Sequence, residues 1–207
     1  PFRPPAQARN PSVSLEWGMA RILKSDLFGR VLLDEGATTV RRDTRPGRWW
    51  LRPLARHLAG REARALARLG DSPGMPRLLS FDGAVLERCW VAGEPMQVAR
   101  PADPAYFREA LGLLRRLHRA GIAHNDLAKE PNWLVTPEGK PALVDFQLAV
   151  VAPRRGRLFR ALAREDLRHL LKHKRSYCPT RLTARQRRIL ATPAPHSRLW
   201  RATGKRA

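Results

Sequence analysis

The sequence predicts an α+β protein in two lobes: a small N-terminal lobe built on a β-sheet with one helix, and a reduced, mostly helical C-terminal lobe. Two patterns carry this prediction. The N-terminal half contains short runs that alternate or are β-branched, separated by turn residues, as strands are. The C-terminal half contains longer segments with apolar residues every three or four positions, as in amphipathic helices. We therefore expect a flexible arm at residues 1–17, a sheet lobe at residues 18–93 and a helical lobe at residues 94–207.

The sheet lobe should contain two pairs of strands and a fifth strand between them in sequence. Residues 20–33 alternate loosely and break at residues 26–29, which favours two strands joined by a tight turn. Residues 37–42 are short and β-branched, which favours a third strand. The dipeptide Asp82-Gly83 predicts a hairpin within residues 78–91.

Residues 49–69 predict the one helix of the sheet lobe, either continuous or broken near Gly60. Its apolar stripe is Leu51, Leu54, Ala55, Leu58, Ala63, Leu66 and Leu69. Trp49 and Trp50 stand beside arginines at its start. This composition suits an anionic membrane surface, but the preferred interpretation is that both tryptophans pack the helix onto the sheet.

The second lobe should begin with a helix from Pro104, capped by Asp103 and ended by Gly121. Its expected buried stripe is Phe107, Ala110, Leu111, Leu114 and Leu117. A hairpin with strands at residues 133–136 and 142–145 follows. Two more helices are expected at the segments 157–174 and 182–191, the second one capped by Thr183.

The chain carries 40 Lys and Arg against 18 Asp and Glu, a formal net charge of +22. We therefore expect anionic partners, namely nucleotide phosphates, nucleic acid, anionic lipid or a phosphorylated sugar, with a merely solvated basic surface as the alternative. Residues 153–207 hold seventeen Lys and Arg against Glu165 and Asp166. This segment could dock an acidic acceptor or bind nucleic acid, although it has no RNA-binding signature.

The cysteines and the apolar runs bear on location. Cys89 and Cys178 lie far apart without metal-ligand spacing, which argues against a disulfide framework or a zinc site. No apolar run is long enough to cross a bilayer, and residues 1–12 lack the apolar centre of a signal peptide. We expect a cytoplasmic location, with peripheral contact at the inner membrane as an alternative.

The chemistry is concentrated in residues 121–147, GIAHNDLAKEPNWLVTPEGKPALVDFQ. A loop followed by a hairpin would bring Asn132 and Asp145, thirteen positions apart, to one place. Their side-chain oxygens are the ligands that Mg²⁺ prefers. Asp126 supplies a carboxylate that can orient an acceptor hydroxyl. The alternative for Asp126 and Asn132 is a simple role in turns.

This segment resembles the HxDxxxxN…DFG set of the protein kinase-like superfamily, and more closely the small bacterial kinases related to the RIO and lipopolysaccharide-core kinase groups. The resemblance implies a bilobal kinase fold that uses ATP and Mg²⁺. It also implies transfer of the γ-phosphate to a hydroxyl, by default of a protein Ser or Thr. A sugar of a lipopolysaccharide core is the alternative acceptor, and a pseudokinase that only binds partners is the alternative function.

The resemblance also implies roles for individual residues. Asp126 would orient or deprotonate the acceptor hydroxyl, and Lys129 would contact the γ-phosphate. His124 belongs to the same loop, more readily as a buttress than as a proton carrier. Asn132 and Asp145 would hold Mg²⁺.

Four positions of the sheet lobe complete the expected nucleotide site. Arg42, with Arg41 as the alternative, would take the place of the usual phosphate-binding lysine, because alternation puts it on the face of Val40. Glu62 would orient that arginine, the alternative being a solvated glutamate. Gly29 is the only glycine of the phosphate loop, and backbone groups near Val91 would recognise adenine.

The chain departs from the kinase pattern in four ways. Arginine replaces the usual lysine, and the loop from Asp126 to Asn132 is one residue longer than the common form. Gln147 replaces the glycine after Asp-Phe, and no activation segment can be recognised after it.

Overall fold

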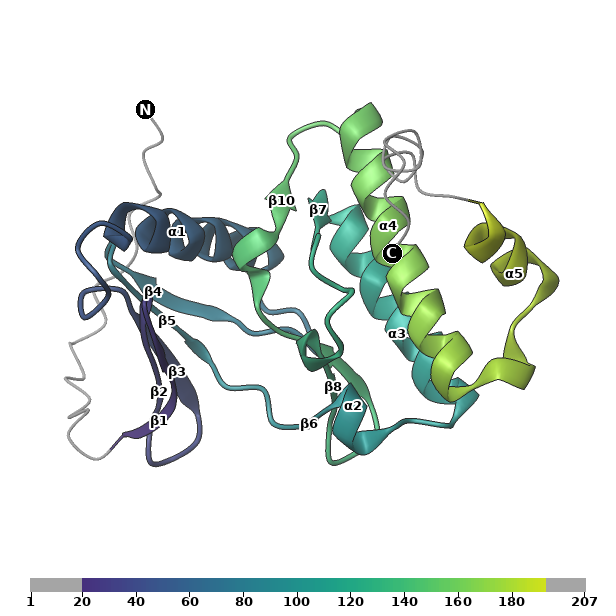
Figure 1. Cartoon of the computed structure of the whole chain (residues 1–207), viewed down its shortest axis with the longest axis horizontal. Helices are drawn as coiled ribbons and strands as arrows, with labels where there is room; N and C mark the ends of the chain where they lie inside the picture. The colour runs from purple at the N-terminus through teal and green to yellow at the C-terminus, as the bar shows by residue number, and fades with distance from the viewer. Residues whose placement is uncertain (1–19, 193–207) are drawn as a thin grey trace, which may run out of the picture.

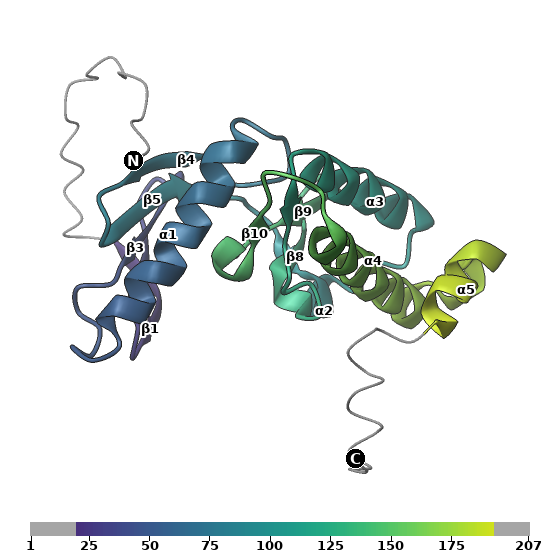
Figure 2. The same ribbon diagram turned by 90° about the horizontal axis from the view of Figure 1, so that it is seen from above.

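A computed structural model describes residues 20–192 of the chain (Figure 1). The arm expected at residues 1–17 and the basic tail beyond residue 192 lie outside the described residues. The fold is mixed α/β and compatible with the predicted α+β class. A five-stranded antiparallel sheet with one long helix forms one part, and a smaller sheet with the remaining long helices forms the other (Figures 1 and 2).

The large sheet has the strand order β1-β2-β3-β5-β4. Its strands are β1 (Arg21–Asp26), β2 (Gly29–Leu33), β3 (Thr39–Asp43), β4 (Leu78–Phe81) and β5 (Val85–Cys89). The predicted strands and their turns are confirmed. At the first turn Asp26 Oδ1 accepts a hydrogen bond from the Phe28 amide at 2.9 Å. At the hairpin turn Asp82 Oδ1 accepts from the amides of Ala84 and Val85.

Helix α1 (Arg52–Leu69) lies along the large sheet and is continuous through Gly60, so the alternative of a broken helix is wrong. A run of alanines on its buried face allows the helix to pack closely on the sheet. Phe81 of β4 lies next to the glycine, at 3.7 Å from the position a Cβ would take. Leu54 was expected in the buried stripe but is 47% exposed.

The two tryptophans before α1 correct a further expectation. Trp49 is 78% exposed and Trp50 is 54% exposed, so neither packs the helix onto the sheet. The small buried face of α1 explains this, because alanines close to the sheet leave no room for an indole at the same interface.

The second part is built on a three-stranded sheet of order β6-β8-β9, with strands β6 (Glu94–Pro95), β8 (Trp133–Val135) and β9 (Pro141–Leu143). The predicted hairpin is confirmed, but β9 ends two residues before Asp145. A second pair, β7 (Ile122–Ala123) with β10 (Val150–Val151), closes the segment between them. Residues 90–93 connect the large five-stranded sheet to the three-stranded sheet.

The helices of this part are α2 (Met96–Ala99), α3 (Pro104–Arg119), α4 (Arg157–Tyr177) and α5 (Ala184–Ala191). The predicted caps are confirmed: Asp103 accepts from the Ala105 amide at 2.7 Å, and Thr183 forms a capping box with Gln186. Leu111 is only partly buried, and Leu113 takes its place in the core. Within residues 20–192, no helix is both long and apolar enough to span a membrane.

The main core lies between α3, α4 and the small sheet, where α3 and α4 pack side by side (Figure 2). Its largest side chains with almost no exposure are Trp133, Phe146, Leu66, Met96, Leu113, Leu114, Leu117, Ile122, Leu127, Leu143 and Leu170. Trp133 and Phe146 both belong to residues 121–147, the segment that contains the candidate catalytic and metal-binding residues. The core therefore holds that segment directly.

Replacing Asp103 with alanine should lower the free energy of unfolding by about 1 kcal/mol, because the first turn of α3 loses its side-chain acceptor. Urea unfolding followed by circular dichroism measures this. Asp71→Ala is the matched control, since Asp71 is exposed and its carboxylate makes no hydrogen bond or ion pair within residues 20–192. Equal stability of the two variants would show that the cap contributes nothing.

Candidate functional site

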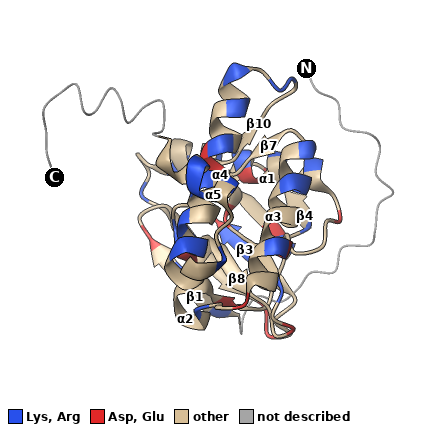
Figure 3. Ribbon diagram, turned by 90° about the vertical axis from the view of Figure 1, so that its right-hand side faces the viewer, with Lys and Arg blue, Asp and Glu red and all other residues tan. Residues whose placement is uncertain are grey.

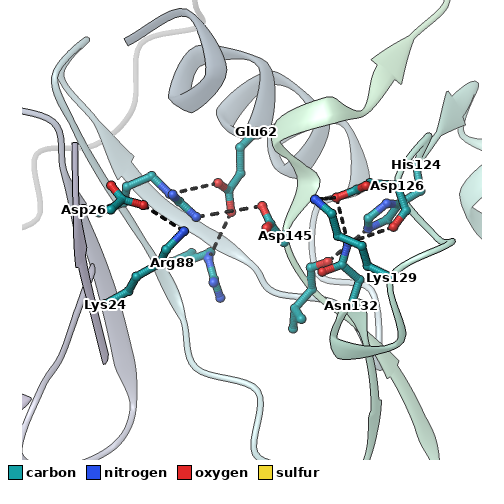
Figure 4. A network of polar contacts seen from close by, with 11 residues as sticks. Lys24, Asp26, Glu62, Arg88, His124, Asp126, Lys129, Asn132 and Asp145 are labelled. Atoms are coloured by element: carbon teal, nitrogen blue, oxygen red, sulfur yellow. Dashed lines mark hydrogen bonds and ion pairs between the residues drawn. The ribbon is translucent and has the colours of Figure 1, made fainter. Parts of the chain in front are cut away.

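The polar residues singled out in the sequence gather between the large sheet and the small one (Figure 4). They come from β3, α1, the loop between β7 and β8, and the turn after β9. Two groups can be distinguished. One is centred on the carboxylate of Glu62, the other on that of Asp126, and Asp145 lies between them.

Glu62 is fully buried on the inner face of α1, so the alternative of a solvated glutamate is wrong. Its two carboxylate oxygens face Arg42 Nε at 3.3 Å and Arg88 Nε at 3.1 Å. A buried carboxylate without such cations would cost several kcal/mol of desolvation, and the two arginines offset this cost. The Glu62 cluster thus ties α1 to β3 and β5.

Arg88 belongs to this cluster but escaped the sequence analysis. It lies on β5, directly opposite Val40 of β3, and is 7% exposed. Burial lowers the pKa of Arg88 below its ordinary value, an effect that the charge of Glu62 opposes. The sequence feature that could have pointed to Arg88 is its position two residues after Leu86, which puts it on the same face of a strand whose other buried residues are apolar.

The choice between Arg41 and Arg42 is clear from the sheet. Arg41 faces away from the site, with its guanidinium 3.8 Å from Glu87 on the neighbouring strand. Arg42 faces α1 and the turn after β9, where its Nη2 atom lies 3.9 Å from Asp145 Oδ1. The structure therefore brings Arg42, and not Arg41, to Glu62.

Gln147 lies against the same guanidinium. When its amide is oriented with the oxygen toward Arg42, that oxygen accepts hydrogen bonds from it. Two of the departures from the kinase pattern, arginine for lysine and glutamine for glycine, are thus in direct contact. An ammonium group could not present the same fork of donors to Glu62 and Gln147 together.

The loop after β7 arranges the second group. Asp126 Oδ2 accepts from Lys129 Nζ at 2.8 Å and from Asn132 Nδ2 at 3.1 Å. Asn132 Nδ2 also donates to the Asp126 backbone carbonyl at 2.9 Å. The Asp126 side chain is mostly buried but remains 13% exposed, and Lys129 is exposed beside it. Both side chains can therefore meet a ligand from solvent.

Asp145 adopts a left-handed backbone conformation, with φ of 63°, at the end of the hairpin. The Val144 amide donates to the Asn132 carbonyl at 3.1 Å, so the two ends of the hairpin meet as expected. Asp145 Oδ1 is buried and has no hydrogen-bond partner within the described residues; the 3.9 Å contact with Arg42 is too long for one. Such an oxygen is suited to a cation.

The donor set fits Mg²⁺ rather than a metal that needs a complete protein cage. Among residues 20–192, no three His, Cys, Asp or Glu side chains are grouped so that they could hold a metal ion. Mg²⁺ takes few protein oxygens and completes its shell with water and phosphate. The Asp145 carboxylate and the Asn132 amide oxygen, whose nitrogen is turned to Asp126, are the residues that would hold it.

His124 is fully buried, which favours the buttressing role over a proton carrier. Its Nε2 lies 3.0 Å from the Val144 carbonyl, and its ring packs on Phe146 at 4.7 Å between centroids. Burial lowers the pKa of His124, and the negative charge of Asp166 opposes that shift. The side chain therefore links the loop before Asp126 to the turn that carries Asp145.

Asp166 of α4 is the second residue that the sequence analysis missed. It is 1% exposed and accepts hydrogen bonds from the amides of His124 at 2.8 Å and Asn125 at 2.9 Å. His118 Nε2 lies 3.1 Å from the same carboxylate. The sequence feature that could have pointed to Asp166 is its place in a basic segment, since Asp166 and Glu165 are the only acidic residues of residues 153–207.

Gly29 and Val91 lie at the margins of the site. Gly29, with φ of 135°, sits so close to the backbone of Asp43 and Thr44 that a side chain would clash, so its glycine is required by strand packing. It lines a cleft beside Arg42 and Gln147. Val91 is half-buried in the connection between the sheets.

No protein-family model matches this chain, and the search of curated proteins gives no match either.

Replacing Asp166 with alanine should lower the free energy of unfolding by roughly 2–4 kcal/mol, because two buried amides and one imidazole lose their acceptor. Chemical denaturation provides the measurement. The control is Glu109→Ala, an exposed acidic position on α3 that should change the stability by less than about 0.5 kcal/mol. If both variants unfold at the same denaturant concentration, Asp166 does not hold the loop.

Stability should also depend on the protonation of His124. Because its folded-state pKa lies below the ordinary value of 6.5, the unfolded chain binds more protons around that pH. Stability should therefore be fully present above pH 6.5 and decline as the pH falls through the folded-state pKa. His169 shifts in the same direction. His124→Gln should thus flatten the decline without abolishing it, and an unchanged slope would contradict the interpretation.

Proposed function

We propose that the chain is an ATP-dependent phosphotransferase of the protein kinase-like type, acting on a hydroxyl acceptor. The observation that carries the proposal is one spatial arrangement. The Arg42–Glu62 pair from the large sheet and α1 faces the loop and turn that carry Asp126, Asn132 and Asp145 (Figure 4). These five residues match the positions at which the kinase motif places its phosphate-binding, metal-binding and hydroxyl-orienting groups.

The architecture supports the same proposal. Five antiparallel strands with α1 would form the nucleotide lobe, and the small sheet with α3, α4 and α5 would form the second lobe. The division at residues 93 and 94 then falls between β5 and β6. In this reading the backbone near Val91 lies where the base would bind, and Gly29 lies in the turn above the phosphates.

Each residue has a role that its surroundings allow. Asp126 accepts the hydrogen bond of the acceptor hydroxyl and orients it, while Lys129 at 2.8 Å holds the carboxylate and can reach the γ-phosphate. Arg42 contacts the phosphates, positioned by Glu62 at 3.3 Å. Mg²⁺, held by Asn132 and Asp145 when nucleotide is bound, supplies positive charge against the phosphate oxygens.

The acceptor is by default the hydroxyl of a protein Ser or Thr. One observation favours the alternative, a sugar of a lipopolysaccharide core or another small anionic acceptor. Only residues 152–156 lie between β10 and α4, so the chain has no long segment there on which an extended peptide could lie. The Lys and Arg positions along α4 and α5, blue in Figure 3, suit an anionic acceptor of either kind.

A pseudokinase that binds a partner without transfer is the second candidate. It is favoured by the engagement of Arg42, whose guanidinium contacts Glu62, Asp145 and Gln147 at once. Nucleotide must compete with these contacts for the same donors. Binding without transfer is then the expected behaviour.

Asp126→Asn should bind Mg-ATP like the parent protein but lose about 10²- to 10⁴-fold in the rate of transfer, because the hydroxyl loses its carboxylate. Thermal shift with ATP and Mg²⁺ measures binding. Labelled ATP with lipopolysaccharide, ribosomal and total-protein fractions measures transfer. Glu138→Gln, an exposed acid on the hairpin turn, is the control.

The outcomes separate the candidates. Transfer that survives in Asp126→Asn contradicts the assignment of Asp126. Stabilisation by Mg-ATP without transfer to any fraction, in the parent as in the variant, supports the pseudokinase. If ATP with Mg²⁺ does not stabilise the parent protein, the phosphotransferase proposal fails, whereas a pseudokinase that binds a partner does not require nucleotide.

A further inference from the structure

The outer face of α1 carries a stripe of side chains, most of them exposed. Its members recur at intervals of four and three positions, so they lie on one side of the helix and of the turn that leads into it. They are Trp50, Leu54, His57, Arg61 and Arg64, of which Arg61 is half-buried and donates to the carbonyls of Leu148 and Ala149. Trp50 and Leu54 are 54% and 47% exposed, and Trp49 beside them is 78% exposed.

The stripe changes character along the helix. The N-terminal end of the stripe is apolar. The exposed turn residues Leu27 and Phe28 extend it, because the Leu27 carbonyl accepts a hydrogen bond from the Arg48 amide at 3.0 Å. Its second half is basic and borders a groove between α1 and β10, lined by His57, Arg61, Arg64 and residues 149–151. An aromatic and aliphatic end thus adjoins a groove with cationic walls.

The charged side chains on the outer side of α1 are all positive. The helix has five arginines and one acidic residue, Glu62, which is buried on the opposite face and neutralised there. No acidic side chain of the helix therefore offsets the cations of the stripe. A tryptophan-rich apolar end followed by uncompensated cations is the composition of protein surfaces that lie in the interface of an anionic bilayer.

We propose that this stripe, together with Trp49, docks on an anionic membrane surface. The indoles and Leu54 insert at the level of the headgroups, and the exposed Arg64 beside the groove takes a lipid phosphate. Nucleic acid fits less well, because Leu54 offers no ring for stacking on bases. The inference does not depend on phosphotransferase activity, since none of the candidate site residues belongs to the stripe.

The full chain should sediment with vesicles of equal parts phosphatidylcholine and phosphatidylglycerol, and much less with phosphatidylcholine alone or at high salt. Trp50→Ala with Leu54→Ala should weaken this binding at least about tenfold, because two apolar side chains leave the interface. Arg64→Gln should weaken it about fivefold. Acyl-chain-brominated lipid should quench the tryptophan fluorescence of the parent more than that of Trp49→Ala with Trp50→Ala.

Two matched variants test the location. Leu158→Ala removes an apolar side chain of α4 that is even more exposed, at 71%, and Arg56→Gln removes a charge from α1 outside the stripe. Both should bind nearly as the parent does, and losses equal to those of the stripe variants would overturn the proposal. It would also be overturned by a dimer that the Trp50→Ala, Leu54→Ala variant disrupts, or by stripe variants that lose oligonucleotide binding while vesicle binding is unchanged.

Discussion

The buried carboxylate of Glu62 is the constraint on which the arrangement of the large sheet and α1 depends. Taking this charge out of water costs free energy. Ion pairs with Arg42 and Arg88, which come from two different strands, offset that cost. The three side chains thereby fix where α1 sits on the sheet. They also fix where the guanidinium of Arg42 points, which is toward Asp145 and Gln147.

A second buried carboxylate plays the corresponding part on the other side of the site. Asp166 holds the backbone of His124 and Asn125 from α4, and His124 in turn contacts the carbonyl of Val144. The loop with Asp126 and the turn with Asp145 are therefore fixed to one rigid helix. Two buried acids, one on each side, place the polar groups of the candidate site opposite one another.

Two of the positions at which the sequence differs from the kinase pattern that it resembles lie in direct contact. They are Arg42 and Gln147, so neither residue can be understood alone. A forked guanidinium needs more acceptors than an ammonium at the same place, and the glutamine amide supplies one. The arginine and the glutamine therefore form one unit of the candidate site.

Much of the secondary structure could be read from local pattern. The turns at Asp26 and Asp82, the caps at Asp103 and Thr183 and the two hairpins depend on residues close in sequence, and these were predicted correctly. Short elements such as β7, β10 and α2 were not, because two to four residues carry too little periodicity.

The sequence by itself determined which residue types stand at the candidate site and that Asn132 and Asp145 meet across a hairpin, since that contact is local. Tertiary structure alone decided the partners that come from distant segments. Arg88 joins Glu62, Asp166 supports the loop of His124, and Trp49 and Trp50 are exposed rather than packed. The physical reason is that burial is a property of the assembled fold. A charge is neutralised, or an indole left in solvent, by neighbours that no local pattern specifies.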